Sequence, residues 1–426
     1  MKRTISLCLA VVILALAAAC SNSGKAQNTA RVRVLHASPD TEAVDILVDN
    51  DVKLASIARN QTSSFSEFPS GTHDFTVRSS ANQAVLATAS LNFSDGVDTT
   101  IVVYGKRSAL QRQVLLDDTA SPDSGKFKIR IADLAAEPGT LDLYVGGADI
   151  SSSPPTSGSL VYATITDYLQ VAEGGSLYLT LAVAGTKDVV FQSPARALSS
   201  GNRMTLAILP SGGGKLVNAS LVMQGSDTTA TFLANTRVRV KAVNAIPDAP
   251  GLGFKADSTI LLSAVPFAGG SSYVTTTAGS RTLQLEAVNV PGTSIATLSR
   301  TLDPALDYSL VATGTLSQPG LVALTDDNTL PSAGYARLRF VNAAADRPAV
   351  DALVNFASQA SSIAYKSGSD YFQFLPADDY QITFSTPGGV TVVATLTPAQ
   401  LLSGAVYTAY LLGPVSSPQV RLVRER

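Results

Sequence analysis

The stretch RVRVLHASPDTEAVDILV, residues 31–48, decides how the chain is organised, because three further stretches align with it without a gap. These are KIRIADLAAEPGTLDLYV from residue 128, RVKAVNAIPDAPGLGFKA from residue 239 and RLRFVNAAADRPAVDALV from residue 337. Self-similar segments at a regular spacing indicate a repeat architecture. The sequence therefore predicts four copies of one structural unit.

Four columns of polar residues recur in this alignment. The base column contains Arg33, Arg130, Lys241 and Arg339. Three residues later stands a polar column of His36, Asp133, Asn244 and Asn342. The next column is acidic in all four units, with Asp40, Glu137, Asp248 and Asp346. The last column contains Asp45, Asp142, Gly253 and Asp351.

The columns have a structural and a functional interpretation. If each stretch is a hairpin centred near residue 39, Arg33 and Asp45 lie opposite each other and pair across strands, which contributes about 0.2–1 kcal/mol. The His36 column then ends the first strand and satisfies main-chain groups of the turn. The alternative is a repeated ligand site. The structural interpretation predicts that Asp142→Ala destabilises the second unit.

Short strands are predicted throughout each unit. An aromatic residue follows a Ser/Thr-x step in each copy, as SSF, TDY, SSY and SDY, ending at Phe65, Tyr168, Tyr273 and Tyr371. A turn follows, and apolar residues then alternate, as Phe75 and Val77 do in the first copy. About seven strands in about 100 residues predict an all-β chain of tandem antiparallel β-sandwiches, Ig-like in architecture. The chain has no Trp, so the Ig hallmark is absent and the strand order stays open.

Turn-forming segments divide the chain. We expect a signal peptide over 1–19 and a lipidated cysteine with a flexible tether over 20–30. The repeats are predicted at 31–122, 126–228, 236–329 and 335–426.

The N-terminus predicts a lipid anchor. Lys2 and Arg3 precede an apolar run of about 15 residues, which is short for a membrane span and typical of a cleaved signal. Small residues then lead into Cys20, and the segment resembles a bacterial lipobox, although Leu16 is one position early. Ser21 follows the cysteine, and the resemblance implies sorting to the outer membrane. The alternative is a soluble secreted protein.

The repeats also resemble a known bacterial family, the domain of unknown function 4397. Its units carry an HASPD-like turn followed by VD and a hydrophobic strand, as in HASPD with VDILV of the first unit and NAAAD with VDALV of the fourth. The third unit keeps IPDAP and the second keeps only LDLYV. The resemblance implies an exported protein, often a lipoprotein, and implies no activity.

Composition excludes several functions. Lys2 and Arg3 are two of 31 basic residues, so the chain after the signal has 29 basic and 33 acidic residues and a net charge of −4, which is not typical of nucleic-acid binding. Cys8 lies in the signal, so Cys20 is the one cysteine of the mature chain and no internal disulfide is expected. His36 and His73 alone are poor evidence for zinc. We expect no catalytic residues and no cofactor.

The junctions between units suggest a calcium hypothesis. Acidic residues recur there, namely Asp117, Asp118, Asp227, Asp326 and Asp327. Calcium takes six to eight oxygen ligands, and no junction offers a complete set, so a solvated polar linker is the main interpretation. The run SGGGK, residues 211–215, lacks the spacing of a phosphate loop and predicts a hairpin loop.

These observations favour a non-enzymatic, lipid-anchored envelope protein that binds, scaffolds or adheres. Its expected partners are the membrane, through the anchor, and an unidentified envelope protein or glycan. The alternatives are an extracytoplasmic enzyme or carbohydrate-binding accessory with a site between repeats, and a calcium-stiffened spacer. Aromatic residues clustered with carboxylates about 5–10 Å apart in one groove would favour the enzyme.

Overall fold

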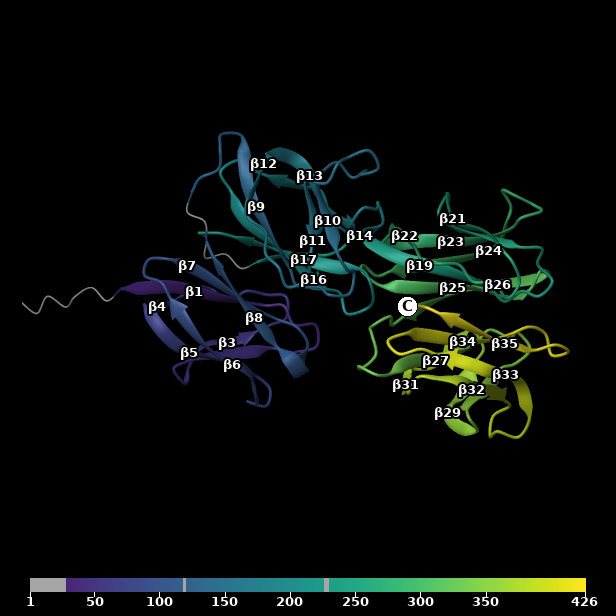
Figure 1. Cartoon of the computed structure of the whole chain (residues 1–426). Helices are drawn as coiled ribbons and strands as arrows, with labels where there is room; N and C mark the ends of the chain where they lie inside the picture. Colours follow the sequence, from purple (N-terminus) through teal and green to yellow (C-terminus); the bar gives the residue numbers. More distant parts are fainter. Residues whose placement is uncertain (1–27, 118–119, 226–229) are drawn as a thin grey trace, which may run out of the picture.

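The computed structural model describes residues 28–117, 120–225 and 230–426, which form four β-sandwiches in chain order (Figure 1). The described residues contain strands and one short 3-10 helix, η1 (Arg107–Ala109), and no α-helix. The prediction of an all-β chain of tandem sandwiches is confirmed. Cys20 and the tether up to residue 27 lie outside the described residues, and the predicted end of the tether at residue 30 is wrong, because Thr29 and Ala30 already belong to the first strand.

Each of the first two sandwiches has an inner sheet, which carries the first strand of the unit, and an outer sheet. In the first unit the inner order is β4-β1-β7-β8 and the outer order is β3-β2-β5-β6. In the second unit the inner order is β12-β9-β16-β17-β18 and the outer order is β11-β10-β13-β14, with β15 also paired to β13. The strand bounds of the first unit are β1 (Thr29–His36), β2 (Val44–Val48), β3 (Asp51–Ile57), β4 (Ser66–Pro69), β5 (Gly71–Ser79), β6 (Val85–Phe93), β7 (Asp98–Tyr104) and β8 (Gln111–Leu116). Those of the second unit are β9 (Lys126–Asp133), β10 (Leu141–Gly146), β11 (Ser157–Leu160), β12 (Leu169–Ala172), β13 (Gly174–Val183), β14 (Val189–Gln192), β15 (Arg196–Leu198), β16 (Arg203–Pro210), β17 (Val217–Met223) and β18 (Thr231–Leu233).

The third and fourth units repeat this arrangement. Their inner orders are β22-β19-β25-β26 and β30-β27-β34-β35, with β31 also paired to β27, and their outer orders are β21-β20-β23-β24 and β29-β28-β32-β33. The bounds in the third unit are β19 (Arg237–Asn244), β20 (Leu252–Ala256), β21 (Thr259–Val265), β22 (Val274–Thr277), β23 (Gly279–Ala287), β24 (Ser294–Leu302), β25 (Asp307–Thr315) and β26 (Gln318–Asp326). Those in the fourth unit are β27 (Ala336–Asn342), β28 (Ala349–Val354), β29 (Ala357–Ala364), β30 (Ser367–Gly368), β31 (Phe372–Phe374), β32 (Ala377–Ser385), β33 (Val392–Leu401), β34 (Val406–Leu412) and β35 (Gln419–Arg424).

The topology corrects three predictions. The first two strands of each unit belong to different sheets, so residues 31–48 are not a hairpin and Arg33 does not face Asp45. Instead the first strand pairs in parallel with a late strand, as β1 does with β7, and this pair departs from the antiparallel pattern that we expected. The second unit also extends past its predicted end at residue 228, because β18 pairs with β17.

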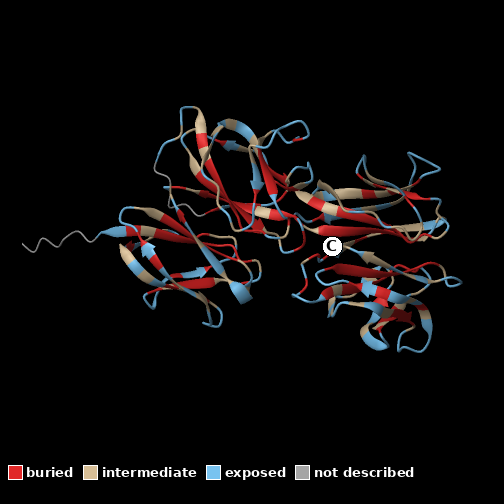
Figure 2. Cartoon of the chain, viewed as in Figure 1, coloured by how far each residue is buried: buried red, intermediate tan, exposed pale blue. Residues whose placement is uncertain are grey.

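The four units associate as two pairs. Each sandwich encloses its own hydrophobic core, and two further apolar clusters lie between units. One joins the first and second units and the other joins the third and fourth (Figure 2). We call units one and two the first pair, and units three and four the second pair.

The inner sheets are buried on both faces. On β7, Ile101 and Val103 pack into the core of the first unit, whereas Val102 and Tyr104 pack against the second unit. Strands buried on both faces have continuous apolar runs, because neither face meets water. Each fully buried Val or Leu contributes about 1.5–3 kcal/mol, so this contact makes each pair one structural block.

The two pairs follow each other along the long direction of the molecule. Figure 1 shows β1 beginning at the end remote from the second pair. An anchor preceding β1 would therefore leave the second pair at the far end.

Candidate functional site

The base column lies at the contact between paired units. Each base stands on the first strand of its unit, opposite a hydroxyl residue of the parallel neighbour, as Arg33 stands opposite Thr100. Arg33 Nε donates to Thr100 Oγ1 at 2.9 Å, and Arg130 and Arg339 bind Thr205 and Thr408 in the same way. The column is therefore buried between sheets and is not an exposed ligand site.

Aromatic residues of the Ser/Thr-x motif lie beneath these bases. The guanidinium carbon of Arg33 lies 4.5 Å from the ring centroid of Phe65, and that of Arg130 lies 4.8 Å from the centroid of Tyr168. The motif hydroxyl accepts a main-chain N–H from the first strand, as Ser63 Oγ does from Val34 at 2.9 Å. The repeated motif thus shapes the pair interface.

The bases also reach across that interface. In the first pair, Arg33 donates to Met223 O of the second unit at 2.7 Å, and Arg130 donates to Leu116 O of the first unit at 2.8 Å. In the second pair, Arg339 donates to Thr325 O at 2.8 Å. Main-chain oxygens at strand ends are therefore satisfied by the neighbouring unit.

Carboxylates complete the second interface. Arg339 pairs with Asp326, and Lys241 pairs with Glu425, in each case between the third and fourth units. Burial alone raises the pKa of Asp326, but Arg339 and Lys241 outweigh burial and hold that pKa below its ordinary value. Tyr273 donates to Asp326 at 2.5 Å, and its own pKa is raised well above the ordinary value by burial.

The junction carboxylates are thus bound by cations of the protein. Asp117 lies 3.8 Å from Arg130, and Asp327 lies 2.6 Å from Arg337. Asp118 and Asp227 lie outside the described residues. Within the described ranges, no three His, Cys, Asp or Glu side chains form a group suited to a metal ion. The described junctions do not support the calcium hypothesis.

The column of His36 ends each first strand, as expected. Asn244 accepts the N–H of Ile246 at 2.9 Å and donates to Val265 O at 3.1 Å. Asn342 makes equivalent bonds, and Asp133 accepts the N–H of Ala135 at 3.1 Å. These side chains satisfy turn and strand ends.

Asp133 and His36 are buried ionisable members of this column. Burial raises the pKa of Asp133 to about 7, and its Oδ2 has no hydrogen-bond partner in the described part of the chain. Burial lowers the pKa of His36, whose Nε2 lies 2.7 Å from Glu42 O.

The last column holds β-bulges in place. Asp142 accepts N–H groups from Ser159 and Gly185, both at 2.9 Å. Ser159 has a positive φ of 57°, and the register of β10 against β11 shifts between Leu141 and Leu143. The same bulge recurs at Asp45, which binds the N–H of Ser56 at 3.0 Å, and at Asp351, which binds the N–H of Ser362 at 2.7 Å. Asp45 does pair with an arginine, but the partner is Arg78 of the same sheet at 3.1 Å.

The acidic column fastens a loop of each unit. Asp40 accepts the N–H of Arg107 at 2.7 Å, Asp248 that of Leu316 at 2.9 Å, and Asp346 that of Val415 at 2.6 Å. The contacts described for these four columns are made to groups of the protein itself, and Lys241 of the base column also lines a groove described below. His73 is equally local, with Nδ1 at 2.6 Å from Asp49 Oδ2.

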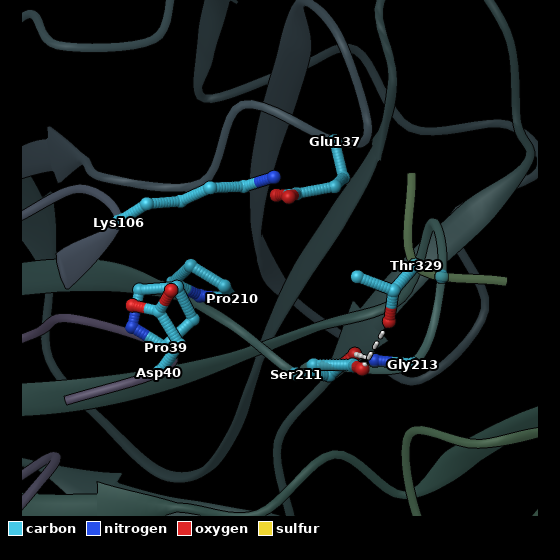
Figure 3. Close-up of a pocket in the computed structure, with 10 residues that line it drawn as sticks. Pro39, Asp40, Lys106, Glu137, Pro210, Ser211, Gly213 and Thr329 are labelled. Carbon is cyan, nitrogen blue, oxygen red and sulfur yellow. Dashed lines mark hydrogen bonds between the residues drawn. The ribbon is translucent and has the colours of Figure 1, made fainter. Parts of the chain in front are cut away.

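The glycine run SGGGK joins the two pairs. Gly213 O accepts the N–H of Asn328 at 3.3 Å, and Gly212 O accepts the hydroxyl of Thr329 at 2.8 Å. A Cβ at Gly214 would stand 2.5 Å from Asp307 Oδ2, and its φ is +150°, so only glycine fits there. Figure 3 shows this loop beside a cavity of about 190 Å³, where Lys106 and Glu137 point toward each other.

On another side of that loop lies a larger groove, of about 860 Å³, which we call the basic groove. The second, third and fourth units all contribute to its walls. Its cations are Lys187, Lys215, Arg237, Arg239, Lys241, Arg424 and Arg426, and its carboxylates are Asp188 and Glu425. A volume of this order holds a substantial ligand.

Most of these cations have no carboxylate partner. Arg239 pairs with Asp307, and Lys241 pairs with Glu425. None of the other five pairs with an Asp or Glu side chain within the described residues, and Arg424 Nε donates to Arg426 O at 3.0 Å. The chain as a whole has a net charge of −2, so the basic groove is a local concentration of positive charge.

Two of the five are partly desolvated. Burial lowers the pKa of Arg237 and of Arg426. Arg237 donates to Gln192 Oε1 at 2.6 Å, but its buried Nε has no partner in the described chain. Arg426 donates to Asn328 O and Glu137 O, both neutral carbonyls. Glu137 and Asp307 attract Arg426 without forming an ion pair with it. Partly buried cations whose hydrogen bonds go to neutral groups favour an anionic ligand.

The basic groove has few aromatic residues and carboxylates in its lining. One aromatic residue lines the basic groove, Tyr273, and Arg239 covers its ring at 4.7 Å. Glu425 is engaged by Lys241. The two carboxylates that line the groove are therefore Asp188, which is exposed, and Glu425, which is paired.

Sequence reasoning missed the cations of this site apart from Lys241. Arg237 and Arg424 lie in different units, and Lys215 was noticed only as the end of the glycine run. Because single cations on strands are common, no local pattern identified them, and only the junction of three units brings them together.

The chain belongs to the family described as domain of unknown function (DUF4397), whose model matches residues 30–144, 237–353 and 342–426. The protein is thus a tandem DUF4397 protein, as the repeats predicted. No curated protein matches the chain. Among the described residues, no helix has the length and apolar character to cross a membrane.

Two solved structures show distant likeness. One is a product complex of the multi-modular glycogen-degrading pneumococcal virulence factor SpuA, with 10% identity and a TM-score of 0.15, covering 87% of this chain and 38% of that chain. The other is a protein from Bacteroides eggerthii provisionally described as a cell adhesion protein, with 9% identity and a TM-score of 0.15, covering 73% and 98%. The chain spans 38% of the length of SpuA, and likenesses at this TM-score carry no functional argument.

Proposed function

We propose that this protein is a lipid-anchored, non-enzymatic binding protein of the bacterial cell envelope that captures an acidic partner in the basic groove. The observation that carries the proposal is the set of five cations without carboxylate partners, drawn from three units into one groove. Bringing an anion to partly buried cations replaces lost hydration with charge-assisted hydrogen bonds, which are the stronger kind.

The test is binding of dextran sulfate to the full mature chain, with neutral dextran as the uncharged comparison. We expect dextran sulfate to bind with an affinity that falls steeply with salt, because the contact is ionic. The double variant Arg237→Gln/Arg424→Gln should weaken binding at least about tenfold, since each lost charge-assisted bond contributes about 1.5–3 kcal/mol.

Arg112→Gln is the matched control, because Arg112 is an exposed cation on β8 outside the groove. Equal losses in this control and in the groove variant would mean that binding is diffuse. Absence of dextran sulfate binding at low salt would refute the proposed function.

Anchoring is the second part of the proposal. Cys20 follows small residues behind an apolar run, and its lipidation would place the chain on the outer membrane, with β1 nearest the membrane. Two or more acyl chains make a stable anchor. Mass spectrometry of the mature N-terminal peptide should find a lipidated Cys20, and Cys20→Ser should move the protein to the soluble fraction. An unmodified thiol on membrane-bound protein would refute the anchor.

A further inference from the structure

The basic groove contains the edge of a sheet, where the Thr275 hydroxyl donates to Val189 O of the second unit at 3.3 Å. β22 is the terminal strand of the inner sheet of the third unit and pairs with β19 alone in the described chain. Its sequence, VTTT, is β-branched throughout and lacks proline and charge. Proteins usually protect edge strands with proline or charged residues, and β22 has neither. The corresponding edge strand of the first unit, β4, contains Glu67 and ends at Pro69.

The ladder leaves main-chain groups of β22 unpaired. Ala278 donates its N–H to Thr236 O, and the register places Thr276 opposite Val238. Because alternate residues of an antiparallel strand bond to the same neighbour, Thr276 bonds to β19 and Thr275 directs its N–H and C=O outward. Thr275 itself lines the basic groove.

Cations flank this edge. Arg237 and Arg239 lie opposite Thr277 and Thr275 on β19, and Lys215 and Arg424 line the same groove from the second and fourth units. A strand rises about 3.3 Å per residue and alternates its side chains, so an added strand presents a side chain to one face about every 6.6 Å. Acidic residues at alternate positions would meet the cations.

We propose that the basic groove binds an extended acidic peptide segment, which adds to β22 as a further strand. Addition to a sheet edge derives affinity from main-chain hydrogen bonds and specificity from alternate side chains. This inference rests on the proposed anion-binding function, and it names the partner as a protein segment in place of an acidic glycan.

The test compares two synthetic peptides that share an alternating Glu-Thr sequence and the same charge, one of which is N-methylated at alternate amides. The full mature chain should bind the unmodified peptide at least about tenfold more tightly, because N-methylation removes the donors for a sheet while leaving the carboxylates. Equal affinities would overturn the inference.

Two variants of the protein give an independent measurement. Thr275→Pro removes the outward N–H, whereas Thr275→Val keeps that N–H and removes only the hydroxyl. We expect Thr275→Pro to lose peptide binding about tenfold while retaining dextran sulfate binding, and Thr275→Val to retain both. A thermal melt checks that both variants fold. If Thr275→Pro does not fold, the comparison of the two peptides on the unaltered protein tests strand addition.

The outcomes separate the two proposals. If dextran sulfate and both peptides fail to bind, the anion-binding function is wrong and the inference falls with it. If dextran sulfate binds and the N-methylated peptide binds as well as its parent, the function stands and strand addition is wrong.

Discussion

The two pairs of units share one architecture but neutralise their buried charges differently. In the first pair, Arg130 lies 3.8 Å from Asp117, and Gln224 occupies the strand end that Glu425 occupies in the second pair. Burial raises the pKa of Asp117 in spite of Arg33, the Gly225 N–H and Arg130. In the second pair, two cations meet two carboxylates, and the pKa of Asp326 is lowered.

This difference shows which parts of the interface the fold requires. Both pairs keep a base, a hydroxyl opposite it and an aromatic ring beneath it. The carboxylates vary, so the apolar contact and the main-chain bonds of the bases define the pairing, and the ion pairs adjust its strength. Removing one partner of a buried pair is nevertheless costly, because the other charge stays uncompensated.

The largest expected effect is therefore at Asp326. Asp326→Ala should lower the free energy of unfolding of the second pair by about 3–5 kcal/mol, because Arg339 is left buried without a counter-charge. Asp117→Ala should lower the free energy of unfolding of the first pair by clearly less, because Arg130 lies 3.8 Å from Asp117 and the pKa of Asp117 is raised. Urea denaturation of the full chain measures both, with exposed Asp188→Ala as the control. Equal losses at Asp117 and Asp326 would contradict the comparison.

The next largest effect concerns Asp133, which occupies in the second unit the column position that Asn244 occupies in the third unit. The raised pKa of Asp133 means that the folded second unit holds a proton which the unfolded chain releases, so its stability falls as pH rises from about 4 to about 7. Three pKa units correspond to about 4 kcal/mol, so Asp133→Asn should stabilise the second unit at pH 8 by up to that amount.

Asn244→Asp is the reciprocal change and should introduce the same pH dependence into the third unit. Thermal melts at pH 4 and pH 8 measure both variants. No gain for Asp133→Asn at pH 8 would mean that Asp133 is charged and solvated in the folded protein.

A smaller effect concerns the bulge column. Asp142→Ala should cost about 1.5–3 kcal/mol, because the N–H groups of Ser159 and Gly185 lose a charged acceptor. The third unit has Gly253 at this position and still keeps a positive φ of 54° at Ala264. A Cβ at Gly253 meets nothing closer than 3.8 Å, so Gly253→Asp should stabilise the third unit by about 1 kcal/mol. Differential scanning calorimetry measures both, and a destabilised Gly253→Asp would show that the bulge needs no carboxylate.

The smallest expected effect is at His73. Arg281 occupies the same place in the third unit, where it contacts Asp257 as His73 contacts Asp49. Asp49 raises the pKa of His73, whereas Arg281 pairs with Asp257 at 3.0 Å. The His73 contribution is complete below pH 6.5 and is lost as pH rises through its raised pKa. The first unit should therefore lose stability from pH 6.5 to 8.5, and His73→Arg should abolish that slope in melts across this range. A slope that persists in His73→Arg would assign it elsewhere.

The fold was largely predictable from particular residues. The alignment from Arg31 gave four units, and period-two runs such as Phe75 and Val77 gave strands. The hairpin over 31–48 was wrong because a turn between two strands looks the same in sequence whether the strands share a sheet or cross between sheets. A continuous apolar run such as IVVY on β7 was the signal for burial on both faces, and it predicts the pairing in retrospect.

The candidate site was less predictable for a physical reason. Its cations come from β19, β35 and two loops of the second unit, and none forms a local motif. The columns that did form motifs contact turns, bulges and interfaces. Residues that every unit needs for folding recur in every copy, and such residues therefore appear as motifs. A site that forms once, where three units meet, produces no repeated pattern in the sequence.

The sequence by itself determined the number of units, their β character and the polar column that ends each first strand, because these follow from recurring local patterns. Only the tertiary structure decided that the units associate in pairs, that Arg33 and Arg339 reach across those pairs, and that the basic groove exists. Arg33 and Met223 are 190 positions apart, and even the nearer contact of Arg339 with Thr325 crosses between two units. These contacts arise from the burial of whole sheet faces, which no short stretch of sequence specifies.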